Sequence, residues 1–291
     1  MKDFLIFNYS WVKNSTYMFE ELLKHHTGDI VTEKTLSNFT PSSRYKAVIV
    51  YLHETHQLDK INQIIELYMP HAYVIQHDTT DHEHVQHWTR RRPDLVFQRE
   101  LTDDTKNFWG CRVFPMHFPM PSLYDESIQD KTIDVSFMAT MTNPRRKPFC
   151  EHVLKLANGS LKHLNWHLRV TPSEVRQPDE FKQVANMSKI GMHYFGNSYD
   201  SHRIWELASA KAAIIMPELR LKSTAPDHMP FYSYCVIRDD FQDLEEKILY
   251  LLEDDRYKEL ANSSFNDYNQ NHTPEKCFEK YHQIILDNIT L

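Results

Sequence analysis

Apolar and polar positions alternate in blocks along this chain. Short apolar runs, typical of buried strands, are separated by segments whose apolar residues recur at helical spacing. In the first half of the chain the predicted strands are Phe4–Asn8, Asp29–Thr32, Lys46–Leu52, Ala72–Gln76 and Leu95–Gln98. The helices predicted between them are Ser15–His25, Leu58–Tyr68 and His82–Arg92.

The second half repeats this alternation. Its predicted strands are Ile133–Ala139, Leu164–Val170, Lys189–Phe195, Ala212–Met216 and Tyr234–Ile237. Its predicted helices are Arg146–Ala157, Asp179–Met187, a helix that Asp200 or Ser201 can cap, Leu244–Leu252 and a helical tail. Regular strand–helix alternation of this kind predicts right-handed crossovers and mostly parallel sheets, which is the α/β class.

A proline-dense stretch, Phe114–Pro121, separates the two series. Proline fixes its own backbone angle and cannot donate to a sheet, so we expect a linker here. The sequence predicts an N-terminal Rossmann-like domain over residues 1–117, a linker over 118–131 and a C-terminal Rossmann-like domain over 132–272. A last helix, residues 273–291, is predicted to pack back on the N-terminal domain. Two such domains place a ligand-binding cleft between them.

Composition narrows the class of protein. The 291 residues carry 33 basic and 40 acidic side chains, a net charge of −7, which argues against generic binding to nucleic acid or anionic membranes. Four scattered cysteines indicate free thiols, and the N-terminal apolar run is too short for a signal peptide, so a cytoplasmic location is expected. Only 5 glycines argue against a glycine-rich phosphate loop, and the 18 histidines have no evident physical reason.

The stretch Tyr199–Met216, YDSHRIWELASAKAAIIM, combines a turn, a capped helix and a strand. Arg203 and Glu206 are three residues apart and therefore neighbours on that helix. A charged first helical turn after a strand of an α/β sheet is where such sheets bind anionic ligands. The alternative is an exposed ion pair that contributes little to stability.

Four segments resemble the GT-B class of glycosyltransferases, in particular the CgeB/YkvP-like "glycosyl transferase family 1" group, with echoes of exostosin-type enzymes. They are IDVSFMATMTNPRRKPF from residue 133, SHRIWELASAKAAIIM from residue 201, DDFQDLEEKILYLLEDDRYKELA from residue 239 and NHTPEKCFEKYHQII from residue 271. The resemblance implies two Rossmann-like domains facing across a cleft. It implies transfer of a sugar from a nucleotide-diphosphate-sugar donor to an unknown hydroxyl acceptor, with no cofactor and no required metal.

The same resemblance assigns the donor site to the C-terminal domain. Glu206 would accept hydrogen bonds from the ribose hydroxyls, and Arg203 would bind the diphosphate. Further donor-site candidates are Ser201, Tyr199, Arg145, Arg146 and Thr142. The alternative is that the arginines form a solvated basic turn, and that Tyr199 and Ser201 are packing and capping residues.

The loop His77–His84, HDTTDHEH, follows the predicted strand Ala72–Gln76. Loops at the carboxyl ends of parallel strands carry function in α/β sheets. Asp78 is the candidate general base toward the acceptor, and His77 and His53 are further candidates because imidazole titrates near neutral pH. The loop is alternatively a solvated capping loop, or the metal site of a metal-dependent hydrolase.

Two further functions stay open at this point. One is a phage-type glycosyltransferase that acts on modified DNA bases, for which Thr89–Arg92 and Lys106 would form a local basic track. The other is a non-catalytic GT-B-like nucleotide-binding protein. The acceptor, whether glycan, protein, small molecule or modified DNA, and the oligomeric state are not specified by the sequence, and no apolar run approaches the length of a membrane span.

Overall fold

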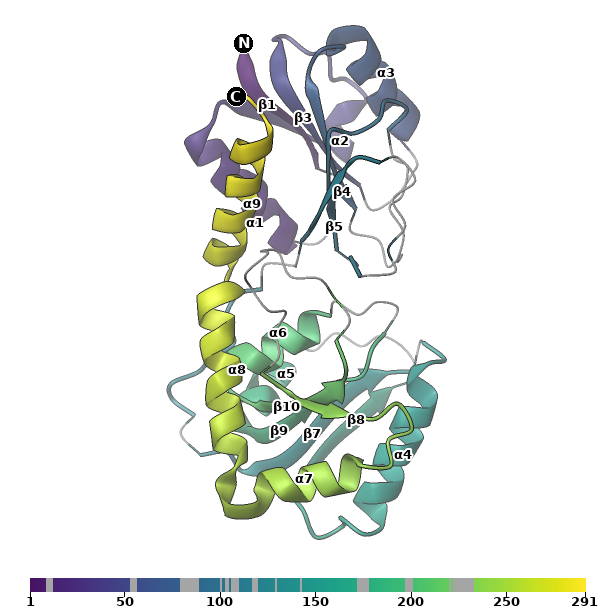
Figure 1. Ribbon diagram of the computed structural model, residues 1–291, viewed down its shortest axis with the longest axis vertical. Coiled ribbons are helices and arrows are strands. Elements are labelled where there is room, and N and C mark those ends of the chain that lie inside the picture. The colour runs from purple at the N-terminus through teal and green to yellow at the C-terminus, as the bar shows by residue number, and fades with distance from the viewer. Residues whose placement is uncertain are drawn as a thin grey trace. The chain divides into compact units, whose positions relative to one another are not determined.

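A computed structural model describes residues 1–8, 13–52, 57–78, 89–99, 101–102, 105, 110–116, 120–128, 130–141, 143–171, 178–196, 201–219, 221 and 233–291. The chain forms two compact units, each with its own sheet (Figure 1). Unit 1 consists chiefly of Met1–Pro119 and Pro274–Leu291, and unit 2 of Met120–Arg220 and Met229–Thr273. Between these main segments the chain changes units at Pro119–Met120 and at Thr273–Pro274, so residues 120–131 of the predicted linker are grouped with unit 2.

The sheet of unit 1 has the order β2-β1-β3-β4-β5-β6, and every strand pair described in it is parallel. Its strands are β1 Lys2–Asn8, β2 Gly28–Thr32, β3 Tyr45–Leu52, β4 Tyr73–Asp78, β5 Leu95–Gln98 and β6 Arg112–Pro115. The helices are α1 Lys13–His25, α2 Glu33–Leu36, α3 Leu58–Tyr68 and, from the end of the chain, α9 Pro274–Asn288.

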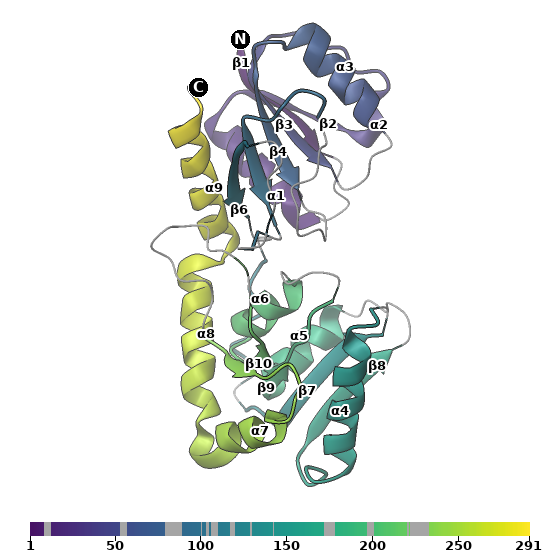
Figure 2. The same cartoon turned by 45° about the vertical axis from the view of Figure 1, so that its right-hand side comes forward.

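Helices cover both faces of this sheet because its strands are apolar on both sides. One face packs Phe4, Ile6 and Ile49 against α1 and α9, and the other packs Leu5, Val48 and Val50 against α3. The C-terminal helix α9 therefore belongs to the core of unit 1, and it lies beside α1 in Figure 2.

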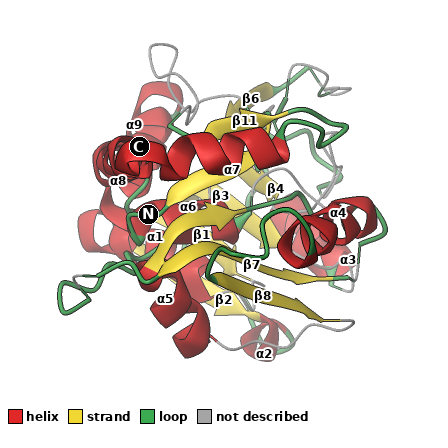
Figure 3. Ribbon diagram, turned by 90° about the horizontal axis from the view of Figure 1, so that it is seen from below, coloured by secondary structure: helices red, strands yellow, loops and turns green. Residues whose placement is uncertain are grey.

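The sheet of unit 2 has the order β11-β10-β9-β7-β8 and is again parallel in every described pair. Its edge strands, β11 and β8, are labelled in Figure 3. Its strands are β7 Ile133–Thr140, β8 Trp166–Thr171, β9 Ser188–Met192, β10 Ala213–Pro217 and β11 Cys235–Ile237. Its helices are α4 Arg146–Asn158, α5 Pro178–Met187, α6 His202–Ser209, α7 Leu244–Leu252 and α8 Tyr257–Asn271, with the short 3-10 helix η1 Glu253–Asp255.

In unit 2, α4 and α7 share one apolar core with the sheet. Helix α6 approaches the sheet closely at Gly191 of β9, where a Cβ atom would lie 2.4 Å from the Leu207 side chain. The absence of a side chain at this glycine is what lets α6 pack directly on the strand.

The strand order of each sheet reverses once. In unit 2 the first strand, β7, lies between the second, β8, and the third, β9. In open α/β sheets of this order, ligands bind outside the carboxyl ends of the strands at that reversal point. The reversal point of unit 2 is therefore the place between the ends of β7 and β9.

The predicted α/β class with two Rossmann-like sheets is confirmed, with one strand missed. Residues Phe114 and Pro115, predicted as part of a linker, belong to β6, which pairs with β5. Pro115 is tolerated because β6 is the edge strand and ends there, so its missing N–H costs no hydrogen bond within the sheet. Most of the predicted helix His82–Arg92 lies outside the described residues, and its last residues, 89–92, are not helical.

Candidate functional site

The two loops that flank the reversal point of unit 2 are hydrogen-bonded to each other. Asn143, which follows β7, donates from Nδ2 to the carbonyl oxygen of Gly196, which follows β9, over 2.7 Å. The Oδ1 atom of the same Asn143 accepts the N–H of Arg145 at 2.8 Å. One amide side chain therefore fixes both loops at the carboxyl edge of the sheet.

Arg146 begins α4 and spans the same gap. Its Nε donates to the carbonyl oxygen of Phe195 at 3.2 Å, and its Nη1 lies 3.1 Å from Oγ1 and 3.3 Å from the carbonyl oxygen of Thr140. Burial lowers the pKa of this guanidinium. A Cβ atom at position 196 would lie 2.4 Å from Nη2 of Arg146, so the glycine makes room for the arginine.

Helix α6 begins beside these loops. Ser201 is its N-cap, and the serine Oγ accepts the N–H of Arg203 at 3.3 Å. Of the two predicted capping residues, Asp200 and Ser201, the serine is the cap. Because serine is favoured at the N-cap, it determines where α6 begins and therefore where the side chains of the first helical turn lie.

Arg203 and Glu206 form an ion pair on α6 with 3.1 Å between Nη1 and Oε2. Their side chains are only 32% and 20% exposed, and the Arg203 guanidinium lies over the ring of Phe181 in α5, 3.4 Å from its centroid. Burial lowers the pKa of Arg203, while the nearby Glu206 opposes that shift and the charge of Arg146 adds to it. The positive charge of Arg146 therefore acts on the Arg203 guanidinium at this edge.

This arrangement suits an anionic ligand. Two guanidinium groups that repel each other are stabilised when an anion binds near both, and the first turn of α6 adds the positive end of a helix. A carboxylate beside them can accept hydrogen bonds from a diol, because an ionised carboxylate is an acceptor only.

The remaining predicted donor-site residues are placed as follows. Arg145 is exposed, and the structure shows a hydrogen bond from its main-chain N–H to Asn143. Tyr199 and Thr142 lie outside the described residues. The structure therefore brings Arg146, Ser201, Arg203 and Glu206 to the carboxyl edge of one sheet.

His77 and Asp78 end β4 in unit 1, and both are buried, at 1% and 0% exposure. The His77 Nε2 atom lies 2.8 Å from the hydroxyl of Tyr281 in α9, and the ring packs against the rings of Phe19, Tyr51 and Phe97. Burial lowers the pKa of His77 to about 3, so its imidazole is neutral near pH 7. These contacts support a packing role for His77.

The Asp78 main-chain carbonyl accepts the N–H of Arg99 at 3.0 Å, which ties the end of β4 to the end of β5. Residues 79–88, which include the rest of the His77–His84 loop, lie outside the described residues, as do His53 and Lys106. Among the residues that are described, no group of three or more His, Cys, Asp or Glu side chains is placed to hold a metal ion.

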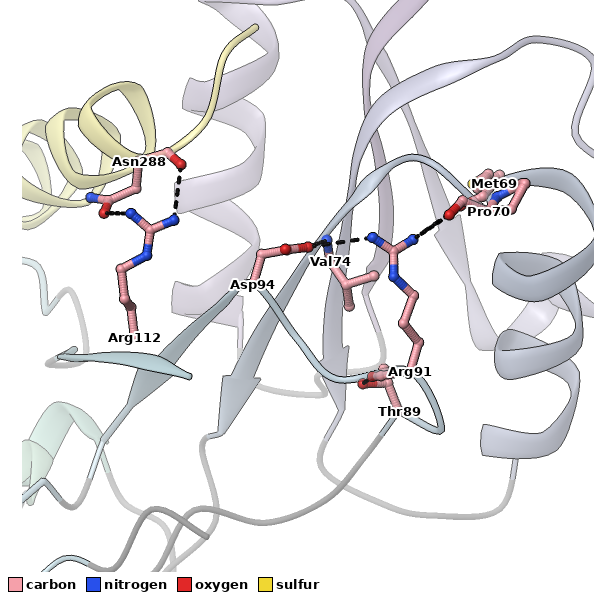
Figure 4. A network of polar contacts seen from close by, with 8 residues as sticks. All are labelled: Met69, Pro70, Val74, Thr89, Arg91, Asp94, Arg112 and Asn288. Atoms are coloured by element: carbon pink, nitrogen blue, oxygen red, sulfur yellow. Dashed lines mark hydrogen bonds and ion pairs between the residues drawn. The ribbon is translucent and has the colours of Figure 1, made fainter. Parts of the chain in front are cut away.

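The arginines of the Arg90–Arg92 track are bound within unit 1. Arg90 pairs with Asp59 at 2.7 Å, and Arg92 donates to the carbonyl oxygen of Gly110 at 2.5 Å. Arg91 donates to the carbonyl oxygen of Pro70 at 3.1 Å and lies 3.6 Å from Asp94 (Figure 4). All three therefore bind groups of their own unit.

No described helix is long and apolar enough to cross a membrane.

Sequence reasoning missed three residues of this site: Asn143, Gly196 and Phe181. Gly196 had a detectable signal, because it is one of only 5 glycines and follows an apolar run directly. Asn143 and Phe181 had none, since their roles depend on contacts with segments distant in sequence, Gly196 and Arg203.

This architecture of two parallel α/β units is shared with GT-B glycosyltransferases. No family model matches the chain, and no curated protein matches its sequence. Solved structures do match it. An alpha-glucosyltransferase in complex with UDP and a 13-mer DNA containing an A:G mismatch is 13% identical and has a TM-score of 0.64, over 98% of this chain and 100% of that one.

Two other solved structures show the same likeness. Anabaena Alr3699/HepE in complex with UDP and glucose is 10% identical with a TM-score of 0.58, over 99% of this chain and 100% of that one. TarM is 12% identical with a TM-score of 0.58, over 81% of this chain and 54% of that one. At these identities the likeness establishes the fold.

Proposed function

We propose that this chain is a glycosyltransferase that moves a sugar from a nucleotide-diphosphate-sugar donor to a hydroxyl acceptor. The observation that carries the proposal is the cluster of Arg146, Arg203 and Glu206 at the reversal point of the unit 2 sheet. The shared fold supports it, because the alpha-glucosyltransferase and Alr3699/HepE structures contain UDP.

The two arginines stabilise the departing diphosphate. Negative charge grows on the leaving phosphate as the sugar–oxygen bond breaks, and fixed positive groups aimed at that charge lower the barrier. Arg203 already lies on the Phe181 ring beside Glu206, so little side-chain entropy is lost when it binds a phosphate. Glu206 binds the ribose diol. The order Ser201, Arg203, Glu206 on one helix also supports placing unit 2 near the CgeB/YkvP-like group.

For the acceptor step, we propose Asp78 as the general base. It ends β4 at the carboxyl edge of the unit 1 sheet, where α/β sheets bind ligands, and its 0% exposure means that it must be uncovered before an acceptor can reach it. His77 is assigned to the core instead, because its Nε2 lies at hydrogen-bonding distance from the Tyr281 hydroxyl and its pKa of about 3 makes it a weak base near pH 7. Asp78→Asn is therefore expected to lower kcat while leaving donor binding unchanged. Full activity in that variant would show that another group is the base.

A thermal-shift series with UDP, GDP, CMP, ADP and their common sugars tests the donor site. A ligand at about 100 times its Kd stabilises the folded protein by about 2.7 kcal/mol, and one nucleotide is expected to do so with or without chelator. Glu206→Ala should abolish the shift. The matched control is Glu279→Ala, which removes an exposed ion pair with the same i, i+3 spacing on α9 and should leave the shift unchanged.

Turnover separates an enzyme from a binding protein. Donor hydrolysis or transfer by the parent, lost in Arg203→Ala, is the expected result. A nucleotide that binds without any turnover would favour the non-catalytic alternative. A shift produced by metal ions alone would favour the metal-dependent hydrolase.

A further inference from the structure

Helix α6 presents three different faces. Ile204, Leu207 and Ala208 are buried in unit 2, as expected from their helical spacing. Arg203 and Glu206 form the half-buried ion pair described above. A third stripe, His202, Trp205 and Ser209, follows the i, i+3, i+7 spacing that places residues on one side of a helix.

The third stripe contacts the segment that enters unit 2 from unit 1, Met120–Leu123, here called the first join. The Nδ1 atom of His202 lies 3.0 Å from the sulfur of Met120. The Oγ of Ser209 accepts the N–H of Leu123 at 3.1 Å. Both ends of the first join are therefore held by α6.

The same stripe also contacts the segment by which the chain returns to unit 1, Asn271–Thr273, here called the second join. The Trp205 ring stacks on the ring of His272, with centroids 4.1 Å apart and an angle of 24° between planes. Trp205 is 1% exposed, so the stack is enclosed within unit 2. Aromatic pairs in such contact prefer defined geometries, so a shift of one ring is resisted by the other.

We infer that His202 and Trp205 are positioning residues that transmit nucleotide binding at Arg203 and Glu206 to the two joins. The inference rests on the proposed donor site. An α-helix moves as a unit, because its backbone hydrogen bonds connect each turn to the next. Since His202 adjoins Arg203 and Trp205 adjoins Glu206, any displacement of the first turns of α6 by a ligand moves both joins.

Helix α6 packs on the sheet through one face and on the two joins through another. The helix is anchored to the sheet through Ile204 and Leu207, with Leu207 fitted against Gly191. The stripe of His202, Trp205 and Ser209 contacts Met120, His272 and Leu123, which lie outside the strands of the sheet. Helix α6 therefore contacts both joins and also carries the proposed ligand residues Arg203 and Glu206.

Hydrogen exchange with UDP as the probe tests this coupling. In the parent protein, saturating UDP is expected to slow amide exchange in both joins by about threefold or more, because a bound ligand makes local opening rarer. His202→Ala should keep UDP binding and lose the protection at Met120, the end of the first join that His202 contacts, while Leu123 stays bound to Ser209. Trp205→Leu should keep UDP binding and lose the protection of the second join.

The matched control is Tyr124→Leu. Tyr124 lies next to the first join and packs on Phe265 of α8, with ring centroids 5.0 Å apart, so this variant removes an aromatic contact that does not involve α6. UDP-dependent protection of both joins should persist in it. If Trp205→Leu fails to fold, the half-buried position of His202 keeps the test available through His202→Ala.

The outcomes separate the two proposals. Absence of UDP binding to the parent overturns the donor site and the coupling together. UDP binding that protects neither join overturns the coupling and leaves the donor site standing. Protection that survives in both His202→Ala and Trp205→Leu likewise overturns the coupling.

Discussion

Gly196 shows how one small residue decides the shape of the candidate site. Its missing side chain leaves the space that the Arg146 guanidinium occupies, and its carbonyl oxygen accepts from Asn143. A hydrogen atom in place of a methyl group thus allows both the arginine and the amide to bridge the ends of β7 and β9.

Gly196→Ala is therefore expected to weaken nucleotide binding. The new methyl group would displace Arg146 from Phe195 and Thr140, and the loss of a charge-assisted contact lowers affinity by about tenfold. Isothermal titration with UDP measures this. The matched control is Gly159→Ala, where a Cβ atom would lie 2.8 Å from the Lys155 carbonyl oxygen; affinity should stay at the parental value there. Equal affinity in both variants would contradict the role of Arg146.

His77 gives a second expectation at the scale of one residue. Its pKa is lowered to about 3 in the folded protein, whereas an unfolded histidine titrates near its ordinary value of 6.5. Between these two pKa values the unfolded state binds a proton at His77 that the folded state does not bind. The contribution of His77 to folding stability is therefore complete above pH 6.5 and is lost as the pH falls toward 3.

Replacing both partners, His77→Phe with Tyr281→Phe, removes this dependence. The paired hydrogen-bonding groups are exchanged for apolar ones of similar shape, which costs little at pH 7.5. At pH 5 the double variant is expected to be more stable than the parent, by about 1–2 kcal/mol. Urea unfolding at both pH values measures the difference. Parallel pH profiles of the two proteins would show that His77 titrates normally.

At the scale of elements, the ends of two helices are held by one lysine. The Nζ of Lys131 donates to the carbonyl oxygen of Asn186 near the end of α5 at 2.9 Å and lies 3.3 Å from that of Ala210, just after α6. Free carbonyl groups at helix ends carry partial negative charge, so a cation suits this position. Burial nevertheless lowers the pKa of Lys131 to about 8, and the nearby Lys211 adds to that effect.

The pH dependence of this lysine has a definite sign. Because the folded pKa is about 8 and the ordinary value is 10.5, the unfolded state binds more protons between these values, and stability from this group rises over that range. Relative to Lys131→Met, the parent should therefore gain stability between pH 8 and pH 10. Denaturant unfolding of both proteins at these pH values checks it. A constant difference would mean that the ammonium is as well solvated as in the unfolded chain.

At the scale of the whole molecule, charge argues against a general DNA-binding surface. The net charge is −7, and Arg90, Arg91 and Arg92 bind groups of unit 1. Changing all three to Gln is therefore expected to lower the melting temperature by several degrees, about 1–3 kcal/mol in stability, and to leave the UDP shift unchanged.

The same variant tests the DNA acceptor directly. We expect weak duplex binding by the parent, with no difference between parent and variant in fluorescence anisotropy at 50 and 200 mM salt. Tight parental binding that falls steeply with salt and disappears in the variant would reverse this conclusion, because such salt dependence reports released counterions.

The sequence by itself determined the secondary structure and the class of fold. Apolar runs such as Lys46–Leu52 and helical spacing such as Leu58–Tyr68 are local properties, and the strands and helices lie close to where these patterns predict them. Strand β6 was not predicted, because prolines in a sequence indicate a linker. Proline is compatible with a strand at the edge of a sheet, and the edge position of β6 is known only from the structure. Arg203 and Glu206 could be singled out because their spacing lies within one helix.

Only the tertiary structure decided which distant residues meet. Asn143 and Gly196 are separated by 53 positions, and His77 and Tyr281 by 204, so no local pattern could pair them. The position of His77 in the core also depends on residues that are distant in the sequence. In the sequence it begins a polar, histidine-rich loop, yet it packs among aromatic rings once α9 returns to unit 1. The periodicity of apolar residues indicates which side of a helix or strand is buried. Which other helix or strand covers that side is determined by the tertiary packing.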